Sequence, residues 1–433
     1  MKITFLGAAR EVGRSAILVE SEGEKILLDC GIKMKKNEEF PLIENSEIKK
    51  LTKVVLSHAH LDHSGYLPAL YAAGYEGKVY MTKPTRDLIQ LLLADALKIQ
   101  KEWSPYNKSD IDALLKNIEI LEYNQLSKDK KIRFQNAGHI LGSAMTEIFL
   151  EGRKLLYTGD INLRSSRLLN GCKTGVEADF LIIESTYGGK GDVHIPTKEA
   201  TNEFISKINE VQKEGGKILI PTFAIGRGQE ILFTLENHLK SGVMEKTPIF
   251  LDGMVKKALK IYRHNAIYLK KEVQRRILAG DDDPFKSEFY KFPKTKSKKE
   301  VFQSKKAIIL ATSGMMTGGP VMKYLEKLAG DEKNMLIIVG YQSEGSIGRK
   351  LLEGEKKLKY KDKIIDVKMR VWNSPFSAHS DHKELVQFAR SMKNLKKAFI
   401  VHGEEERLFD LAEDIKSKNT EVFIPHLKES FEV

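Results

Sequence analysis

The sequence predicts an α/β protein with two regions, and three observations support this. The chain has 433 residues, which exceeds the size of one ordinary domain. Up to Gly191, short apolar runs bounded by Gly, Asp or Ser recur, which is typical of β-strands. After Gly191, apolar runs alternate with stretches of helical periodicity, which is typical of a parallel, Rossmann-like sheet.

The first region opens with three closely spaced apolar runs, KITFLG, SAILVE and EKILLDCG, which predict antiparallel strands. VVLSHAH predicts a further strand, followed by a helix over 62–73. Helical periodicity recurs over 84–102 and 109–118. Strand patterning then returns in KIRFQNAGH, AMTEIFLE, RKLLYTGD and DFLIIEST.

In the second region, helices predicted over 197–214 and 227–241 lead into the apolar runs KILIPTF and TPIFLD. KAIILAT precedes another helical stretch and then NMLIIVG. The lysine-rich stretch 291–306 is expected to be an exposed loop. The chain continues through the strand DKIIDVKMRVW, and its last predicted strands, KAFIVHGEEE and EVFIP, each follow a helix.

Composition narrows the class of protein. A net charge of +12 favours a polyanionic partner such as nucleic acid, although lysine used only for solubility would give the same excess. Two cysteines, Cys30 and Cys172, cannot form a disulfide framework, so a reducing, cytoplasmic location is expected. The N-terminal apolar stretch is too short for a signal peptide, and no segment has the length of a membrane span.

The segment VVLSHAHLDHSG (54–65) holds three of the chain's 11 histidines. Alternate residues of an extended segment point to one side, so His58 and His60 can bind one metal ion. Asp62 and His63 follow where a helix is expected to begin, and both could reach a second ion. Imidazole and carboxylate ligands suit zinc, with manganese or iron as substitutes.

Three more candidate ligands lie at predicted strand ends. They are Asp29 in LLDCG, His139 in AGHILGSA and Asp160 in YTGDIN. Taken singly, each aspartate could be an ordinary turn residue, because Asp beside Gly is common in turns. Together with the histidine segment they provide enough ligands for two metal ions.

In this order, LLDCG, SHAHLDH, AGHILGSA and TGDIN resemble the successive motifs of the metallo-β-lactamase superfamily. The resemblance implies an αββα sandwich with a dinuclear zinc site. It implies that His58, His60 and His139 hold one ion, that Asp62 and His63 hold the other, and that Asp160 bridges. Asp29 would orient ligands or contact the bridging hydroxide.

Three later motifs resemble those of the β-CASP nucleases, whose matching stretches cover essentially the whole chain. They place Glu184 in IIESTYG, His379 in NSPFSAHSDH and His402 in KAFIVHGEEE. Singly, these could be a turn residue, a neighbour of a helix cap and a strand-end histidine. The family resemblance implies that His402 completes the second metal site, that His379 is a phosphate ligand or general acid, and that Glu184 orients it.

The same resemblance implies an inserted β-CASP domain over 188–370, between lactamase-fold segments 1–187 and 371–433. The motifs are most similar to those of archaeal cleavage-and-polyadenylation-specificity-factor-like ribonucleases without KH domains. Members that act on RNA have a histidine at the position of His402, whereas members that act on DNA have valine. The expected reaction is metal-dependent hydrolysis of RNA to 5′-phosphate and 3′-hydroxyl ends.

Gly-rich loops after strands of the second region offer N–H groups to phosphates. They contribute the candidate substrate-binding residues Arg227, Ser313, Gly314, Ser343 and Arg349; Ser377, in NSPFSAHSDH, is a further one. The loops could also be ordinary strand-to-helix turns, but phosphate contact is favoured because they lie where a parallel sheet exposes the carboxyl ends of its strands. Lysine clusters at 256–260, 270–276 and 294–306 could follow an RNA backbone.

An endonuclease acting on single-stranded RNA is the favoured interpretation, and an RNase J-like 5′-to-3′ exonuclease is the alternative. A small-molecule metallohydrolase would not need the extra domain or the basic charge. A non-catalytic RNA-binding subunit would not need the complete ligand set. The sequence is compatible with a homodimer and with membership of an RNA-processing complex, and it decides neither.

Overall fold

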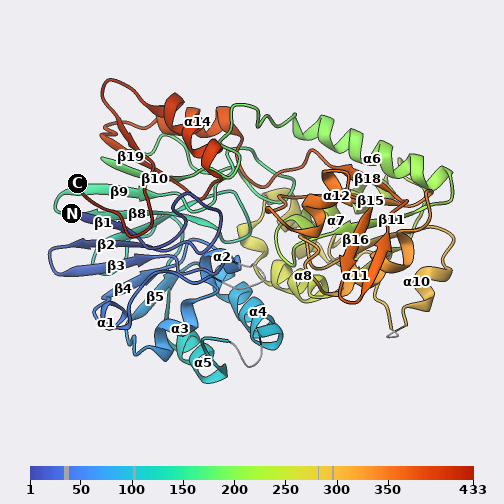
Figure 1. Cartoon of the computed structure of the whole chain (residues 1–433), viewed down its shortest axis with the longest axis horizontal. Helices are drawn as coiled ribbons and strands as arrows, with labels where there is room; N and C mark the ends of the chain where they lie inside the picture. The colour runs from blue at the N-terminus through green and yellow to red at the C-terminus, as the bar shows by residue number, and fades with distance from the viewer. Residues whose placement is uncertain (34–38, 101–103, 281, 295–296) are drawn as a thin grey trace. The chain divides into compact units, whose positions relative to one another are not determined.

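The computed structural model describes residues 1–433 except 34–38, 101–103, 281 and 295–296, and it contains two compact units (Figure 1). Unit 1 comprises Met1–Ser165, Leu169–Val193 and His379–Val433. Unit 2 comprises Ser166–Leu168 and His194–Ala378. The second unit is therefore inserted into the first.

Unit 1 contains a seven-stranded sheet in the order β21-β1-β2-β3-β4-β5-β6. Strands β1 to β3 pair antiparallel, as their spacing in the sequence predicts, and β3 to β6 pair parallel. The strands are β1 (Lys2–Phe5), β2 (Ile17–Ser21), β3 (Glu24–Leu28), β4 (Lys53–Val55), β5 (Lys78–Met81), β6 (Ile118–Ile120) and β21 (Ser430–Glu432).

A second sheet of unit 1 has six strands in the order β20-β19-β10-β9-β8-β7. Buried residues of both sheets, among them Ile3, Ile17, Phe134 and Phe399, form one apolar cluster, so the sheets pack face to face. The strands are β7 (Ile132–Asn136), β8 (Ala144–Leu150), β9 (Arg153–Tyr157), β10 (Phe180–Glu184), β19 (Lys397–Val401) and β20 (Glu421–Phe423).

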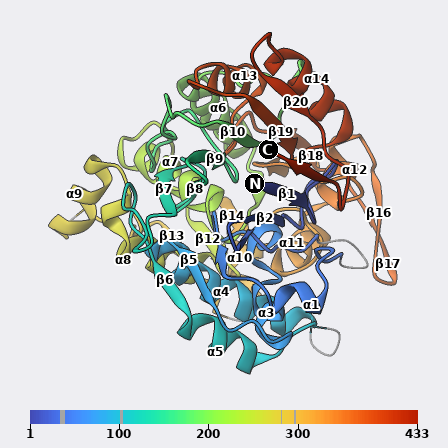
Figure 2. The same cartoon turned by 90° about the vertical axis from the view of Figure 1, so that its left-hand side faces the viewer.

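Helices cover the outer faces of the two sheets. Leu385 of α13 and Leu408 of α14 pack with Leu181 and Ile183 of β10. Figures 1 and 2 show α3, α4 and α5 beside β4 and β5 of the other sheet. This is the αββα sandwich expected from the sequence. The helices are α1 (Asn45–Ile48), α2 (Leu61–Ser64), α3 (Leu67–Ala72), α4 (Lys83–Gln100), α5 (Lys108–Lys116), α13 (His382–Arg390) and α14 (Glu405–Ile415).

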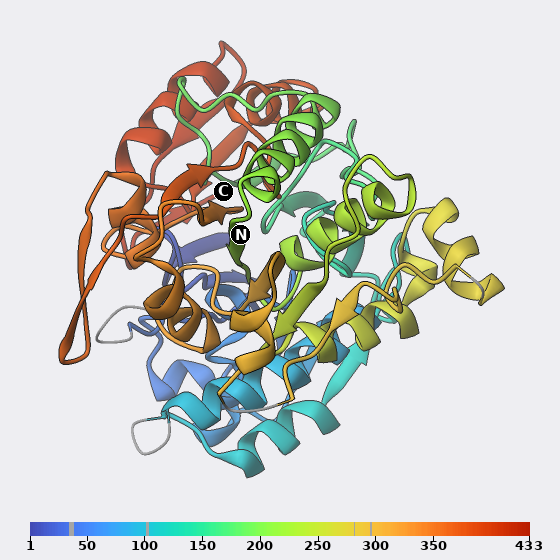
Figure 3. The ribbon, with the colours of Figure 1, turned by 90° about the vertical axis from the view of Figure 1, so that its right-hand side faces the viewer.

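Unit 2 contains a six-stranded sheet in the order β13-β12-β14-β11-β15-β18, and all its strand pairs are parallel (Figure 3). The parallel sheet predicted from the alternating pattern is confirmed. The strands are β11 (Lys217–Pro221), β12 (Ile249–Asp252), β13 (Tyr290–Lys291), β14 (Ala307–Ala311), β15 (Met335–Ile338) and β18 (Arg370–Asn373). The helices are α6 (Thr197–Lys213), α7 (Arg227–Lys240), α8 (Val255–His264), the 3-10 helix η2 (Ala266–Tyr268), α9 (Lys271–Ala279), α10 (Lys299–Gln303), α11 (Pro320–Leu328) and α12 (Ile347–Leu352).

The structure differs from the sequence-based expectations in four places. The helix expected over 62–73 is two helices, α2 and α3, because Pro68 opens the second one. DKIIDVKMRVW forms two strands: β17 (Lys363–Asp366), which pairs with β16 (Lys357–Tyr360), and β18. Because β18 pairs with β15, unit 2 extends to Ala378 rather than to residue 370. The expected loop over 291–306 contains the short helix α10.

Within the described ranges, none of the helices is both long and apolar enough to cross a membrane.

Candidate metal centre

The histidine segment leaves the sheet at the end of β4 and turns into α2, whose N-terminal cap is His60. His58 and His60 precede the helix, and their Nε2 and Nδ1 atoms lie 3.2 Å apart. Asp62 and His63 occupy the first turn of α2. Gly31 lets the segment after β3 approach this turn, because a Cβ at residue 31 would lie 1.7 Å from the Asp62 carbonyl oxygen.

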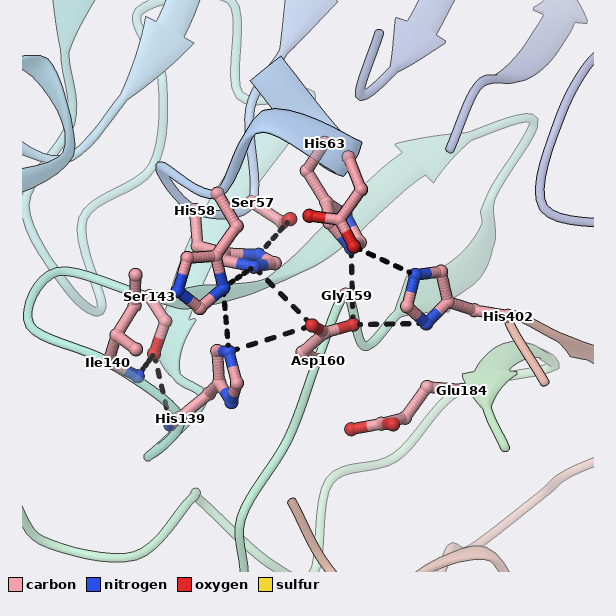
Figure 4. A network of polar contacts seen from close by, with 12 residues as sticks. Ser57, His58, His63, His139, Ile140, Ser143, Gly159, Asp160, Glu184 and His402 are labelled. Atoms are coloured by element: carbon pink, nitrogen blue, oxygen red, sulfur yellow. Dashed lines mark hydrogen bonds and ion pairs between the residues drawn. The ribbon is translucent and has the colours of Figure 1, made fainter. Parts of the chain in front are cut away.

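Asp160, at the turn after β9, lies at the centre of the cluster (Figure 4). Its Oδ2 atom is 3.4 Å from His58 Nε2 and 3.6 Å from His139 Nε2. Its Oδ1 atom is 3.2 Å from His63 Nε2 and 3.6 Å from His402 Nδ1. The two oxygens of one carboxylate therefore face two different pairs of histidines.

Donor atoms group around this carboxylate in two sets. His58, His60, His139 and Asp160 each offer a ligand atom, and these atoms all lie within 4.8 Å of one another. Asp62, His63 and His402 form the second set by the same measure. The residues that the sequence analysis assigns to each of two metal ions thus lie near one another, and their roles as ligands stay a prediction. Asp160 also groups with Glu184 and His402, so Glu184 borders the centre as well.

Asp29, which follows β3, holds His63 of the second set in place and contacts Ser57, the residue before His58. It is fully buried, and it accepts hydrogen bonds from the Ser57 amide and hydroxyl, both at 2.7 Å. Tyr157 donates its hydroxyl at 2.7 Å, and His63 Nδ1 lies 2.6 Å from the same carboxylate. With Nδ1 engaged in this way, His63 turns its Nε2 atom toward Asp160.

Two strained or tight turns present the remaining ligands. The Ser143 hydroxyl accepts the amides of His139 and Ile140 at 3.1 and 3.2 Å and closes the turn that carries His139. His402 has a left-handed backbone with φ 53°, and its amide donates to the Ala8 carbonyl at 2.8 Å. Non-glycine residues rarely adopt this backbone region, so its occurrence at His402 is consistent with a functional position.

His379, which is partly buried, pairs with the buried Glu184 at the edge of the cluster. His379 Nδ1 lies 3.0 and 2.9 Å from the two Glu184 oxygens, and the Glu184 side chain is 1% exposed. Glu184 Oε1 also accepts the Ile161 amide at 2.7 Å. Burial alone would lower the pKa of His379, but the charge and hydrogen bond of Glu184 outweigh it and raise that pKa.

The donor set fits divalent metal ions. Within the part of the chain that the structure describes, His63 Nε2, His402 Nε2 and Asp160 Oδ1 are buried and make no hydrogen bond. Burial is the largest cause that lowers the pKa of His58, and the charge of His63 lowers it further. A low pKa favours the neutral imidazole, which is the form that binds metals. Burial alone would raise the pKa of Asp160, but His63 and its neighbours hold that pKa well below the ordinary range.

Several residues that contact the candidate ligands were not predicted from the sequence. Ser57 and Tyr157 contact Asp29, Ser143 holds the His139 turn, and Thr186 Oγ1 lies 3.3 Å from His402 Nδ1. Ser57 directly precedes His58, and Tyr157 stands three residues before Asp160, so proximity to a ligand was the available signal. Hydroxyl groups near metal ligands are too common in sequences for that signal to select them.

In unit 2, the Gly-rich loops after β11, β14 and β15 meet. Gly314 packs against Phe223, and a Cβ at residue 314 would lie 2.9 Å from the Phe223 ring. The Gln342 side chain donates to the Gly314 carbonyl at 3.1 Å, and Ser343 Oγ lies 3.3 Å from Met315 Sδ. Ser313 therefore shares one loop cluster with Gly314 and Ser343.

The other three candidate substrate residues, Arg227, Arg349 and Ser377, are not among the residues whose contacts define this loop cluster. Arg227 begins α7 and lies over the Phe376 ring, 5.9 Å from its centroid, next to Ser377 in sequence. Arg349 lies on α12, where its Nε donates to Glu353 at 2.7 Å. A phosphate would have to compete with Glu353 for this guanidinium.

Comparisons with known proteins agree with this geometry. Family models match the Metallo-beta-lactamase superfamily domain over residues 18–183, the Beta-Casp domain over 228–351 and the Zn-dependent metallo-hydrolase RNA specificity domain over 364–425. The chain is 40% identical to Transcription termination factor FttA of Methanocaldococcus jannaschii, over 96% of this chain and 69% of that protein. It is 38% identical to an RNase J-like protein of the same organism, over 98% of this chain and 97% of that protein.

A solved structure shares the fold. A protein of unknown function from Enterococcus faecalis V583 aligns over 99% of both chains with a TM-score of 0.58 and 13% sequence identity. The αββα sandwich and the histidine–aspartate cluster define a metal-dependent hydrolase with a site for divalent metal ions. The chain belongs to the β-CASP family of the metallo-β-lactamase superfamily, a family of metal-dependent nucleases.

Proposed function

We propose that the protein is a zinc-dependent ribonuclease that cuts single-stranded RNA internally. The observation that carries this proposal is the pairing of His379 with the buried Glu184, beside a cluster in which the two oxygens of Asp160 face two pairs of histidines. The arrangement combines ligands for two cations with a separate group that can hold a proton. Manganese or iron could occupy the same nitrogen and oxygen ligands.

The residues have distinct roles in this proposal. His58, His60 and His139 would hold one cation, Asp62, His63 and His402 the other, and Asp160 both. Bound there, two cations would supply a hydroxide nucleophile at neutral pH and neutralise the phosphoryl oxygens. Asp29 fixes the orientation of His63 through its 2.6 Å contact with Nδ1.

His379 is the proposed proton donor. Its Nδ1 faces Glu184, so a protonated ring holds its second proton on Nε2. That proton would pass to the departing ribose oxygen as the phosphodiester bond breaks. Glu184 fixes the tautomer and the ring orientation, as a carboxylate does for histidine in other acid–base pairs.

Two findings support RNA as the substrate. Residues 364–425 match a domain described as an RNA specificity domain, and an RNase J-like protein is a relative over nearly its whole length. His402 is also the residue type that RNA-directed β-CASP proteins have at this position, where DNA-directed members have valine. Other relatives are named for transcription termination, which is consistent with action on nascent RNA.

The loop cluster of unit 2 is the proposed phosphate-binding surface. Ser313 and Ser343 offer hydroxyl groups there, and the loop around Gly314 offers backbone N–H groups. Arg227, Arg349 and Ser377 would add contacts to the same backbone. Arg349 is the weakest of these candidates, because it already pairs with Glu353.

An RNase J-like 5′-to-3′ exonuclease is the second candidate. It is supported by the relative of that name, since the alignment covers 97% of that protein. Endonuclease and exonuclease would use the same metal centre, so only the products separate them.

The test uses zinc-loaded protein and two labelled RNAs of one sequence, one circular and one linear with a 5′-monophosphate. Cutting of the circle would establish an endonuclease. Loss of the linear RNA alone, as mononucleotides, would establish a 5′-end-dependent exonuclease and overturn the preferred assignment. The His58→Ala variant controls for contaminating nucleases. If neither RNA is cut under conditions in which the metal is bound, the proposed function is wrong.

The proton-donor role makes a separate prediction. We expect His379→Ala to keep its bound metal and to slow single-turnover cleavage by about 10²- to 10⁴-fold, the usual contribution of general acid catalysis. His426→Ala, which removes an exposed histidine of the same unit, is the matched control and should cleave normally. Cleavage by His379→Ala at the wild-type rate would exclude the role.

A further inference from the structure

The segment that follows the bridging ligand, 161–164, is bound closely to the segment that follows His379. The Ser380 amide donates to the Ile161 carbonyl at 2.9 Å, and the Leu163 amide donates to the Ser380 hydroxyl at 2.9 Å. Ser380 is fully buried. The segment that follows Asp160 is therefore hydrogen-bonded to the segment that follows His379.

Arg164 adds a charged clamp to this pairing. Its Nη2 donates to Asp381 Oδ2 at 2.9 Å, and its Nε donates to Glu384 Oε1 at 2.5 Å. The Asp381 side chain is only 3% exposed, so this ion pair is shielded from solvent on the carboxylate side. One guanidinium thus spans two carboxylates of the His379 segment.

The remaining oxygens of both carboxylates close the first turn of α13. Asp381 Oδ1 accepts the Glu384 amide at 3.0 Å, and Glu384 Oε2 accepts the Asp381 amide at 3.1 Å. This is a capping box, in which the two side chains satisfy each other's backbone amides. Arg164 therefore orients both members of the cap that fixes the start of α13, two residues after His379.

We propose that Arg164 is a positioning residue, which sets His379 at its working distance from the metal-bridging Asp160. The proposal rests on the proposed ribonuclease function. Arg164 reaches neither Asp160 nor His379 through these bonds, and it acts through the Asp381–Glu384 cap. A guanidinium suits this position because its planar fork can bond two carboxylates at once, whereas a lysine ammonium is a point charge.

The test compares Arg164→Met and Arg164→Lys with a matched control, Arg370→Met. The Arg370 side chain is 30% exposed and also pairs with two carboxylates, Glu210 and Glu214, but it lies in unit 2. The Arg164 side chain is 31% exposed.

We expect Arg164→Met to slow single-turnover cleavage by about 10- to 100-fold, because small misplacements of a catalytic group have effects of that size. Affinity for RNA and bound metal per chain should match the wild type, and Arg164→Lys should be intermediate.

A double-mutant cycle separates positioning from general damage. If Arg164 acts through His379, adding Arg164→Met to His379→Ala should slow cleavage by less than about threefold. If Arg164→Met slows the His379→Ala enzyme by the same factor as it slows the wild type, the positioning role is wrong. Loss of bound metal in both Arg164 variants would also overturn it, because the effect would then lie in the metal ligands.

A measurement without catalysis keeps the two proposals distinguishable. Diethyl pyrocarbonate carbethoxylates imidazole nitrogens, and mass spectrometry reports the rate at each histidine. His379 is 13% exposed in the wild type, so a loosened segment should raise its rate several-fold. The exposed His264 serves as the internal reference. An unchanged rate of His379 carbethoxylation in Arg164→Met would contradict the positioning role, whether or not the protein cleaves RNA.

Discussion

At the scale of single residues, Asp160 determines the character of the centre. Its two oxygens face separate pairs of histidines, one pair in each donor set. Gly159 allows this placement, because a Cβ there would lie 2.7 Å from the Ser57 side chain. The TGD sequence thus places a carboxylate between two pairs of histidines.

Asp160→Asn is expected to lose metal as well as activity. An amide offers one oxygen and a nitrogen that cannot bind a cation, so one histidine pair loses its shared ligand. We expect bound metal per chain to fall by at least about half and RNA cleavage to fall by at least about 10³-fold. Elemental analysis and single-turnover kinetics would measure these effects. Asp112→Asn on the exposed face of α5 is the matched control, and full metal content in Asp160→Asn would contradict the bridging role.

At the scale of elements, charged side chains connect strands β3 and β4 at their starts, whereas the histidine cluster follows their other ends. Glu24, at the start of β3, contacts Lys53 of β4 at 2.6 Å and Lys131, which precedes β7, also at 2.6 Å. Partial burial alone would raise the pKa of Glu24, but the hydrogen bonds from Lys131 and Lys53 outweigh it and lower that pKa to about 2. The ionised carboxylate therefore joins three elements.

Glu24→Gln should destabilise the protein in a pH-dependent way. The folded pKa lies below the ordinary value of 4.5, so the stabilisation is complete above about pH 4.5 and is lost as the pH falls toward 2. We expect a deficit of about 1 kcal/mol at pH 7, because solvent screens such pairs, and a smaller deficit at pH 3. Urea-unfolding midpoints at both pH values would measure it. The exposed Glu76→Gln should show no deficit, and an equal deficit for Glu24→Gln at both pH values would contradict the assignment.

At the scale of the whole molecule, the sequence predicted the architecture better than the details of the site. The alternation of apolar runs with helical stretches predicted the parallel sheet of unit 2, because the sequences of buried parallel strands are continuous apolar runs. The Asp29 contacts to Ser57 and Tyr157 could not be predicted, since they join residues far apart in the chain. The Arg164 clamp spans 217 residues to Asp381, and only the folded chain shows it.

The net charge of +12 is also distributed in a way that the composition does not reveal. Helix α8 has ten residues and none is acidic. Its buried face carries Val255, Leu259 and Tyr262, and its exposed face carries Lys256, Lys257 and Lys260. Helix α6, in the same unit, mixes lysine with glutamate instead. If the charge serves RNA binding, α8 should contribute more of it than α6.

We therefore expect removal of the three α8 lysines, by substitution with alanine, to weaken RNA binding and to reduce its salt dependence. Each lost phosphate contact should lower the slope of log affinity against log salt by about 0.7, or about 2 in all, for single-stranded RNA. Binding of a labelled RNA, measured over a series of salt concentrations with the His58→Ala protein to prevent cleavage, gives the slope. Alanine at Lys198, Lys207 and Lys213 of α6 removes the same charge from the same unit, and it should leave the slope nearly unchanged. Equal slopes for both triple variants would mean that the basic charge acts only through the overall field of the protein.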